Sequence, residues 1–261
     1  MNLQDNVQAG LLRPVRKAGL ALARHWPWPV AARMTSGRQM YVDLRSSVGR
    51  AIYMKGEFDP KVFEAFADKL KPGGIFLDVG ANVGFYSMLA LDALGETGEV
   101  HAFEIDPRPL RCLRKSIRTF SLKNVHLHER AVGDRNGPAI LVQREDCGHS
   151  SVVTEGSGVS VPMITLDGWR ERHPRGTVQA IKLDIEGGEV RALLGARELL
   201  HRERPLLVCE VVDDPEDRRR SDTRALFGLL EAAGYRWRWI EGCNDATLMA
   251  EPASVADSSL S

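Results

Sequence analysis

Short apolar runs alternate with amphipathic stretches along most of the chain, from about residue 73 to residue 250. Apolar runs bounded by Gly, Pro or Asn predict buried strands, whereas apolar positions that recur every three or four residues predict helices. Strands are predicted at 75–79, 99–103, 125–132, 180–184 and 206–211, with helices after each of the first two strands and over 189–200 and 223–233. This alternation favours an α/β fold with a mostly parallel sheet and helices on both faces.

The pattern is less regular on both sides of this block. Residues 38–54 alternate enough to predict a short hairpin, and Asp59-Pro60 predicts the start of a helix that ends before Gly74. Tyr235 to Ile240 and Ala246 to Ala250 are expected to close the sheet as an antiparallel pair. We therefore expect an accessory region of helices and a hairpin over 1–72, the main domain over 73–250, and a frayed polar tail over 251–261. Within the main domain, residues 133–162 are rich in Gly and Ser and predict an irregular insertion that faces the substrate.

Charge and cysteine content narrow the choice of partners. The 35 basic and 35 acidic residues cancel, so no global field favours nucleic acid or an anionic membrane, and a small or neutral partner fits better. No apolar run approaches the roughly 20 residues of a membrane span. The four cysteines are far apart and form no C-x-x-C pair, which predicts reduced thiols in a cytoplasmic protein without a disulfide framework or a zinc site. The basic segment 11–34 is interpreted as a packed accessory helix, with a membrane-surface or partner-binding helix as the alternative.

A glycine-rich loop follows the first predicted strand. Residues 78–84 read Asp-Val-Gly-Ala-Asn-Val-Gly. This is close to the dinucleotide-binding pattern, but Asp78 distinguishes the loop from a dinucleotide-binding loop. A carboxylate at this strand end would repel the pyrophosphate of a nicotinamide or flavin cofactor. S-adenosylmethionine carries an ammonium and a sulfonium group and no phosphate. The loop therefore favours S-adenosylmethionine over a dinucleotide.

The ends of the next two strands extend this prediction. Glu104 ends the second strand about twenty residues after the loop, where an acidic side chain accepts both ribose hydroxyls. Taken singly, Asp78 could instead cap the next helix and Glu104 could be a solvated acid near a turn. Both, however, occupy the strand ends that one nucleoside would span, and the combination favours the cofactor. Ala131 and Val132 at the third strand end are expected beside the adenine, with Val132 or Ile105 covering its face.

An acidic turn, residues 182–189, follows the fourth predicted strand. Acids in the first turn of a helix complement its dipole, and Glu189 is assigned to that role. Asp184 and Glu186 are instead placed beside the transferable methyl group. Methyl transfer is an in-line displacement, in which alignment supplies about 7–11 kcal/mol of the barrier reduction and a general base about 10²- to 10⁴-fold in rate.

An alcohol acceptor must lose a proton as it attacks, so a base is expected within reach. The candidates are Asp184, Glu186 and His149, although a lone loop histidine is more often structural. Candidate acceptor contacts are Ser150 and Ser151, which follow His149 in the insertion, and Glu210 at the end of the fifth strand. The carboxylates show no established metal-ligand spacing, so no metal site is predicted.

Six segments together resemble the FkbM family of methyltransferases. They cover residues 73–212, with KLDIEGGE as the most specific part, and read FLDVGANVGFYSMLA, VHAFEIDP, NVHLHERAVGD, VPMITLDGW, IKLDIEGGEVRALLGA and RPLLVCEV. The resemblance implies a class I, Rossmann-like methyltransferase fold whose seven-stranded sheet has one antiparallel edge strand. It also implies that the methionine part of the cofactor is held by Asp78, Gly80, Asn82 and Gly84, the ribose by Glu104, and the reaction zone by Asp184 and Glu186.

Family members mainly methylate hydroxyls of natural products, sugars or glycans, and some methylate nitrogen in peptides. The expected function is thus O-methylation of a small-molecule or saccharide acceptor, with N-methylation of an amide or amine as the alternative. Two other classes stay open on the residues alone: a nicotinamide-dependent oxidoreductase and a cofactor-binding module without catalysis. The acceptor's identity and the oligomeric state, including a homodimer, also stay open. The flanking regions 1–70 and 212–261 are expected to shape the acceptor site.

Overall fold

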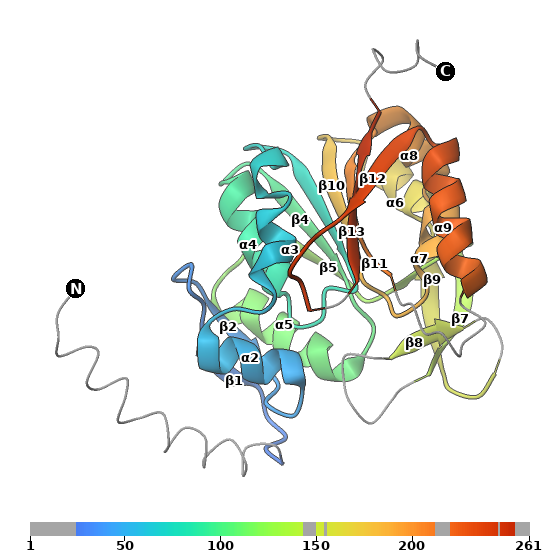
Figure 1. Cartoon of the computed structure of the whole chain (residues 1–261). Helices are drawn as coiled ribbons and strands as arrows, with labels where there is room; N and C mark the ends of the chain where they lie inside the picture. Colours follow the sequence, from blue (N-terminus) through green and yellow to red (C-terminus); the bar gives the residue numbers. More distant parts are fainter. Residues whose placement is uncertain (1–24, 143–149, 154–155, 212–219, 245, 254–261) are drawn as a thin grey trace.

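Seven strands form the main sheet of the protein (Figure 1). The computed structural model describes residues 25–142, 150–153, 156–211, 220–244 and 246–253. The strand order is β12-β13-β11-β10-β3-β4-β5. The bounds are β3 Ile75–Val79, β4 Glu99–Phe103, β5 Val125–His128, β10 Val178–Leu183, β11 Leu206–Glu210, β12 Tyr235–Trp239 and β13 Thr247–Pro252. The predicted seven-stranded, mostly parallel sheet is confirmed.

One strand runs against the others. Strands β3, β4, β5, β10 and β11 pair in parallel, and β13 pairs antiparallel with both β11 and β12. The expectation of an antiparallel strand at the edge is therefore wrong, since β13 lies between β11 and β12. The connection over 240–246 returns the chain beside β11, which leaves β12 at the edge. The strand also extends through Pro252, two residues into the expected tail.

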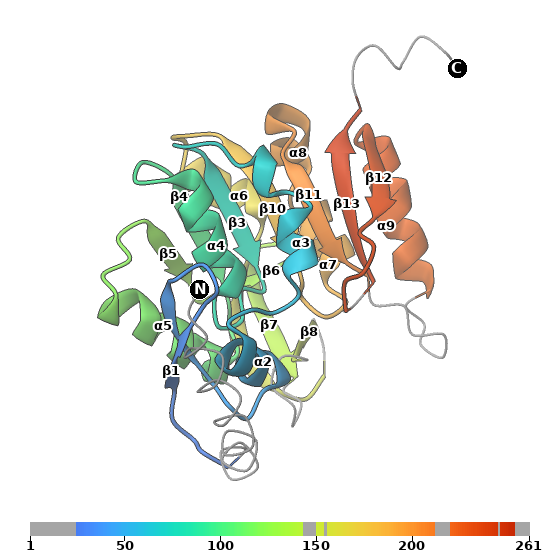
Figure 2. The ribbon, with the colours of Figure 1, turned by 60° about the vertical axis from the view of Figure 1, so that its left-hand side comes forward.

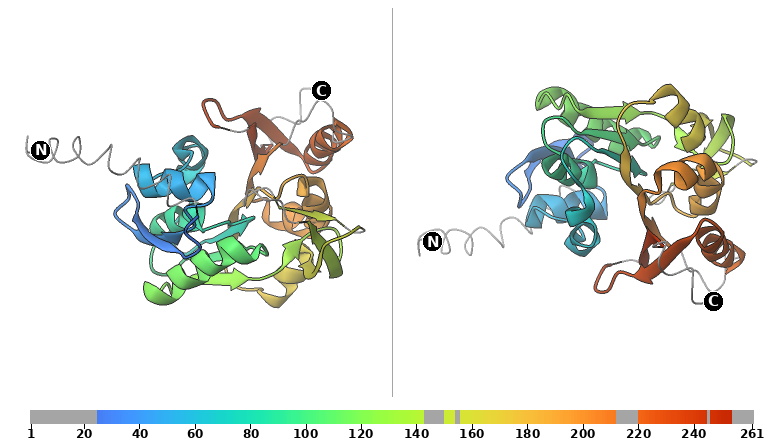
Figure 3. Two further views of the ribbon diagram at one scale, coloured as in Figure 1. Left: turned by 90° about the horizontal axis from the view of Figure 1, so that it is seen from below. Right: turned by 90° about the horizontal axis from the view of Figure 1, so that it is seen from above.

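Helices cover both faces of the sheet (Figures 2 and 3). One layer contains α2 Ser47–Lys55, α3 Pro60–Glu64, α4 Phe85–Leu94 and α5 Pro107–Thr119, and the other contains α6 Leu166–Arg172, α7 Glu189–Leu194, α8 Arg197–Glu203 and α9 Arg220–Ala232. Because side chains alternate along a strand, neighbouring residues of β3 enter different cores: Phe76 packs with the first layer and Leu77 with the second. Burial on both faces explains why the strands are apolar runs.

The accessory region differs from its prediction. The hairpin is formed by β1 Val30–Arg33 and β2 Gln39–Val42, not by residues 38–54, and residues 47–55 are helical. The Ser46 hydroxyl caps this helix by accepting a hydrogen bond from the backbone N–H of Gly49, and Gly56 ends it at φ 78°. Tyr41 N–H donates to Ser116 Oγ at 2.8 Å, which attaches the hairpin to α5. A short 3₁₀ helix, η1 Ala67–Lys69, leads to the main sheet.

A second, four-stranded sheet takes three of its strands from the predicted insertion 133–162. Its order is β6-β9-β7-β8, from β6 Ala131–Val132, β7 Gly137–Val142, β8 Ser151–Val153 and β9 Val159–Ile164. The predicted third strand, 125–132, is consequently divided between the two sheets. The predicted helix 189–200 is also divided, because Gly195 packs on the Gly133 carbonyl so closely that a Cβ there would lie 2.1 Å from its oxygen.

The predicted basic helix and frayed tail lie largely outside the described residues. Within the described ranges no helix has the length and hydropathy to cross a membrane. Cys112, Cys209 and Cys243 are free thiols.

Candidate active site

A cavity of about 390 Å³ opens at the carboxyl ends of β3, β4 and β10. Parallel α/β sheets bind ligands at this end, and the volume lies in the range of small-molecule sites. Its walls come from all parts of the described chain: Ser47, Val48 and Phe58 from the accessory region, Leu141, Ser150 and Val152 from the second sheet, and Asn244 from the β12–β13 connection. The insertion and both flanking regions therefore contribute to the cavity.

The glycine loop forms one wall through its backbone. Gly80 has φ 82°, and a Cβ at this position would lie 1.8 Å from the carbonyl oxygen of Asp184. This contact between the ends of β3 and β10 requires glycine. Asn82 adopts φ 50° and its side-chain oxygen accepts a hydrogen bond from Val83 N–H at 2.8 Å. Gly80 and Asn82 line the cavity, whereas Gly84 packs against Leu113 and is not among the lining residues.

Glu104 lies at the end of β4 with its carboxylate in the cavity wall. Oε2 accepts from Asn82 N–H at 2.8 Å, and Oε1 accepts from Ile105 N–H at 2.7 Å and Asp106 N–H at 2.8 Å. Burial raises the pKa of Glu104 to about 7, although the three backbone donors act in the opposite direction. Since a carboxylate has about four lone-pair positions, capacity for a further donor is left.

Asp78 lies near the carboxyl end of its strand, as predicted, but its side chain is buried outside the cavity. It is the fourth residue of β3, is 1% exposed and is not among the residues that line the cavity. Its Oδ2 accepts from Ser87 Oγ of α4 at 2.6 Å, and Oδ1 has no hydrogen-bond partner among the described residues. Burial raises the pKa of this carboxyl, and Lys182 and Ser87 oppose the rise. Asp78 thus supports the loop from behind the wall.

Lys182 is a functional candidate that sequence reasoning missed. Its side chain is 5% exposed, its Nζ lies 2.5 Å from Asp184 Oδ2, and Asp78 is its register partner on β3. Burial alone would lower the pKa of Lys182, but the carboxylates of Asp184 and Asp78 raise it above its ordinary value. A lysine inside an apolar strand, between Ile181 and Leu183, is the sequence signal that could have identified it.

Three carboxylates converge at the other end of the cavity. Oxygens of Asp184, Glu186 and Glu210 lie within 4.8 Å of one another. Burial, a hydrogen bond with Asp184 and repulsion from Asp184 and Glu186 raise the pKa of Glu210 well above its ordinary value. Burial beside these two carboxylates therefore favours the protonated form of Glu210. Glu186 adopts φ 56°, a strained conformation for a residue other than glycine.

The remaining predicted residues are distributed as follows. Ile105, Ala131 and Val132 line the cavity. Ser150 lines it as well, but its hydroxyl donates to Asp106 Oδ2 at 2.6 Å and so joins the second sheet to the start of α5. Ser151 lies in β8 and is not among the lining residues. His149 lies outside the described residues.

Arg130 was expected at the third strand end beside the adenine, whereas Arg191 and the buried acid Glu189 were not predicted in the roles that the structure shows. Arg130 and Arg191 line the cavity, and Arg191 Nη2 is paired with Asp134 Oδ1 at 2.8 Å. Glu189 is buried and accepts from Ile185 N–H at 3.0 Å and Gly187 N–H at 3.4 Å, so it shapes the acidic turn in addition to starting α7. Its pKa is raised to about 7 by burial.

Comparison with known proteins identifies the family of this chain. The sequence pattern of the methyltransferase FkbM domain matches residues 78–237, more than half of the chain. The chain belongs to the FkbM family of S-adenosylmethionine-dependent methyltransferases. This membership confirms the predicted resemblance.

Solved structures of methyltransferases are similar to this FkbM-family chain. Methyltransferase FkbM from Methylobacillus flagellatus KT is 19% identical with a TM-score of 0.50, over 70% of this chain and 44% of that protein, which agrees with the class I fold. Aeropyrum pernix fibrillarin, solved with natively bound S-adenosyl-L-methionine, is 13% identical with a TM-score of 0.47, over 86% of this chain and 99% of that one.

A curated relative matches a shorter segment. The "Probable cobalt-precorrin-6B C(15)-methyltransferase (decarboxylating)" of Sulfolobus acidocaldarius is 44% identical over 57 residues, which is 22% of this chain and 30% of the relative. The chain thus matches less than half the length of this relative and of the Methylobacillus structure.

Proposed function

We propose that this FkbM-family protein transfers a methyl group from S-adenosylmethionine to a hydroxyl of a small-molecule or saccharide acceptor. The main support is the charge of the cavity: five acidic residues and two arginines line it. The acids are Glu104, Asp106, Asp184, Glu186 and Glu210. A cationic, phosphate-free cofactor fits such walls, whereas a dinucleotide pyrophosphate would be repelled.

The residues present fit this cofactor at the end of the cavity near the glycine loop. Glu104 would accept hydroxyl hydrogen bonds of the ribose, Ile105 and Val132 would cover the adenine, and the backbone at Gly80 and Asn82 would border the methionine part. When bound, S-adenosylmethionine supplies an electrophilic methyl group. Asp78 acts only as a positioning residue in this proposal, because it supports the loop through Ser87 and balances Lys182.

The acidic end would receive the acceptor. Lys182 holds Asp184 through their 2.5 Å contact, and burial together with the neighbouring Asp184 raises the pKa of Glu210. Glu186 completes the group, since its carboxylate lies within 4.8 Å of the other two. Asp184 or Glu186 accepts the proton of the attacking hydroxyl. His149 stays a further candidate for this step, and Ser150, Ser151 and Glu210 stay candidates for acceptor contacts.

Calorimetry tests the cofactor half of the proposal. The variant Glu104→Gln removes the charged acceptor for the ribose hydroxyls, and a hydrogen bond to a charged group is worth about 1.5–3 kcal/mol. We expect the Kd for S-adenosylmethionine to rise about 10- to 150-fold. Glu129→Gln is the matched control, since Glu129 is exposed and paired with Arg114 outside the cavity. No binding by the wild type, or equal binding by Glu104→Gln, would contradict the proposal.

Labelled methyl transfer to hydroxyl- and amine-bearing acceptors tests the other half. For a hydroxyl acceptor, Asp184→Asn and Glu186→Gln should lower kcat by about 10²- to 10⁴-fold, the range of a general base. Their Kd for the cofactor serves as the internal control. Turnover that depends on neither carboxylate, with an amine or amide as the methylated group, would establish N-methylation instead. Tight cofactor binding with no methylated product would point to a binding module.

A further inference from the structure

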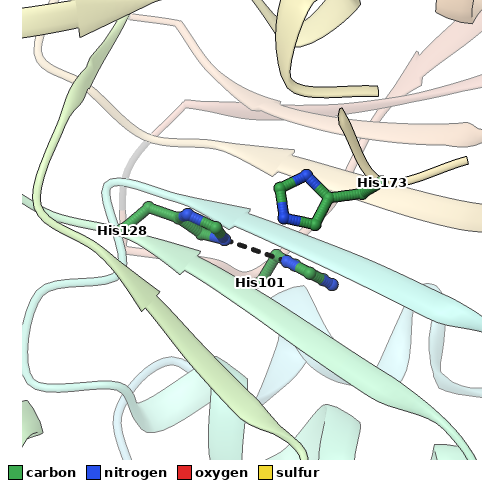
Figure 4. Close-up of side chains that lie close together, drawn as sticks. All are labelled: His101, His128 and His173. Atoms are coloured by element: carbon green, nitrogen blue, oxygen red, sulfur yellow. Dashed lines mark hydrogen bonds between the residues drawn. The ribbon is translucent and has the colours of Figure 1, made fainter. Parts of the chain in front are cut away.

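A histidine-rich patch lies outside the candidate active site, at the β4–β5 edge of the main sheet. His101 of β4 and His126 and His128 of β5 share one face of the sheet, with His101 and His126 as register partners. His173, directly after α6, approaches the same face from the helical layer (Figure 4). Three elements that are distant in sequence therefore bring imidazoles together.

Three of these rings direct nitrogens to one point. His101 Nδ1 and His128 Nε2 are 2.9 Å apart and hydrogen-bonded. His173 Nδ1 lies 2.9 Å from the Trp169 carbonyl oxygen, and its other ring nitrogen faces the His101–His128 pair (Figure 4). One nitrogen from each ring lies within 4.8 Å of the other two. Such convergence is unusual for histidines that only fill space, because packing does not require nitrogens to face one another.

The outer nitrogens have the partners that ligating histidines have. His101 Nε2 lies 3.3 Å from Glu99 Oε2, and His173 Nδ1 faces a backbone carbonyl. When the outer nitrogen donates its proton to a carboxylate or carbonyl, the inner nitrogen presents a lone pair, and metal-bound histidines are oriented in this way. Glu99 and Trp169 thus orient two of the three rings.

The protonation state agrees with this geometry. Burial, with smaller contributions from the neighbouring histidines and from an arginine, lowers the pKa of His101 and of His128 to about 3. The rings are therefore neutral at neutral pH, the form in which histidine binds metals. Arg170, the arginine that acts on His101, is itself paired with Glu203.

We propose that His101, His128 and His173 form a binding site for a divalent ion of the zinc class, with water as the fourth ligand. Three imidazoles and a water are an established zinc ligand set. Without the ion, one ring donates its N–H proton in the hydrogen bond between His101 and His128. When the ion binds between the two rings, this proton moves to the other nitrogen of the donating ring, so that both facing nitrogens present lone pairs. Zinc–nitrogen bonds of about 2.0–2.1 Å need nitrogens roughly 3.3 Å apart, so the pair opens by roughly 0.4 Å.

Such an ion would connect α6 to the sheet behind the candidate active site. His128 stacks on Phe103 with ring centroids 4.6 Å apart, and Phe103 lines the cavity. No metal site was predicted from the sequence, because the ligands have no recognisable spacing along the chain. Only the register of β4 and β5 and the position of α6 bring them together.

The test uses the full chain, stripped of metal with a chelator and without S-adenosylmethionine. Zn²⁺ is titrated by calorimetry, and Co²⁺ is titrated by the visible absorption of a tetrahedral site. We expect one equivalent to bind, and Glu99→Gln to weaken binding about 10- to 100-fold, as loss of an orienting partner does. His128→Gln and His173→Gln should weaken it at least as much. His201→Gln on α8 is the matched control, since His201 is exposed outside the patch.

Two results would count against binding at these three histidines. No saturable binding by the wild type overturns the proposal, whether or not the variants fold. Binding that survives His173→Gln but is lost in His126→Gln also overturns it, because the ion would then sit at the surface group of Glu99, His101 and His126. Since the titration contains no cofactor, its result is independent of the proposed methyl transfer.

Discussion

Replacement of Lys182 by Met tests whether this buried cation stabilises the two carboxylates beside it, those of Asp184 and Asp78. The methionine keeps the length and apolar stem of the side chain and removes its charge. Lys182 Nζ lies 2.5 Å from Asp184 Oδ2 and 4.6 Å from the centre of the Tyr86 ring, and Asp78 beside it is 1% exposed. The variant therefore leaves one fully buried and one partly exposed carboxylate without their cation.

The expected loss follows from these distances. At 2.5 Å and an effective dielectric constant of about 20, the attraction of Lys182 to Asp184 is roughly 6–7 kcal/mol. Desolvation of the ammonium group in the native protein offsets part of this. Removal of one partner from a buried pair typically costs about 3–5 kcal/mol. Because the Asp184 side chain is 35% exposed and water can solvate it, we expect the lower end, a loss of about 3 kcal/mol in unfolding free energy.

Urea denaturation at pH 7 measures this loss, and it should appear as a lower midpoint with an unchanged m-value. Lys61→Met is the matched control, because the Lys61–Glu64 pair is exposed and such pairs contribute about 0–1 kcal/mol. The double variant Lys182→Met with Asp78→Asn should recover part of the loss, since it removes one unbalanced charge. A loss below about 1 kcal/mol, or no recovery in the double variant, would refute this account of the buried cation.

Two further predictions concern the loops that join at the cavity. Gly80→Ala should destabilise the protein by more than Gly37→Ala: both glycines have positive φ, with a strain of about 1–3 kcal/mol for alanine, but only Gly80 would also place its Cβ 1.8 Å from Asp184 O. Equal losses in thermal or urea unfolding would contradict the close contact. Burial raises the pKa of Glu189 from 4.5 to about 7, so the folded state holds a proton that the unfolded state has lost, and stability falls as the pH rises through this window. As the pH is raised from 4.5 to 7, the unfolding free energy of Glu189→Gln should therefore increase relative to that of the wild type, by up to about 1.4 kcal/mol per pH unit. A difference between the two proteins that does not change with pH would refute the raised pKa.

The parts of the fold that were predictable from sequence are those whose signal is local. All five residues of β3 are buried and four of them are apolar, so an apolar run interrupted only by Asp78 marks the strand. The points at which predicted elements are interrupted were not predictable, because contacts between residues distant in sequence cause them. Gly195, for example, interrupts a helical pattern where it meets the carbonyl of Gly133. The alternation over 38–54 is typical of a hairpin and outweighs the weaker signal of a cap at Ser46, which the structure shows to start a helix.

The candidate site was likewise predictable from the sequence only in part. Glu104 was correctly expected at a strand end beside the loop, since parallel strands bring their carboxyl ends to one edge. Whether an acid at that edge faces the cavity depends on the pleat and on its neighbours. In the sequence, Asp78 and Glu104 look alike, since each is an acid at a strand end. In the structure, the Asp78 side chain instead accepts a hydrogen bond from Ser87, and the residue is not among those that line the cavity. The cluster of His101, His128 and His173 shows no pattern at all until the strands are in register.

The glycine loop and the acidic turn are best understood as one unit. Gly80 touches the backbone of Asp184, Lys182 holds its carboxylate, and Asp78 faces Lys182 across the β3–β10 pair. A displacement of the loop proposed to hold the cofactor would therefore move the carboxylate proposed to receive the acceptor's proton. Because in-line transfer depends on alignment, this coupling would let one rigid contact fix the positions of both proposed reactants. The glycine at position 80 is then required by the protein's own backbone before any ligand arrives.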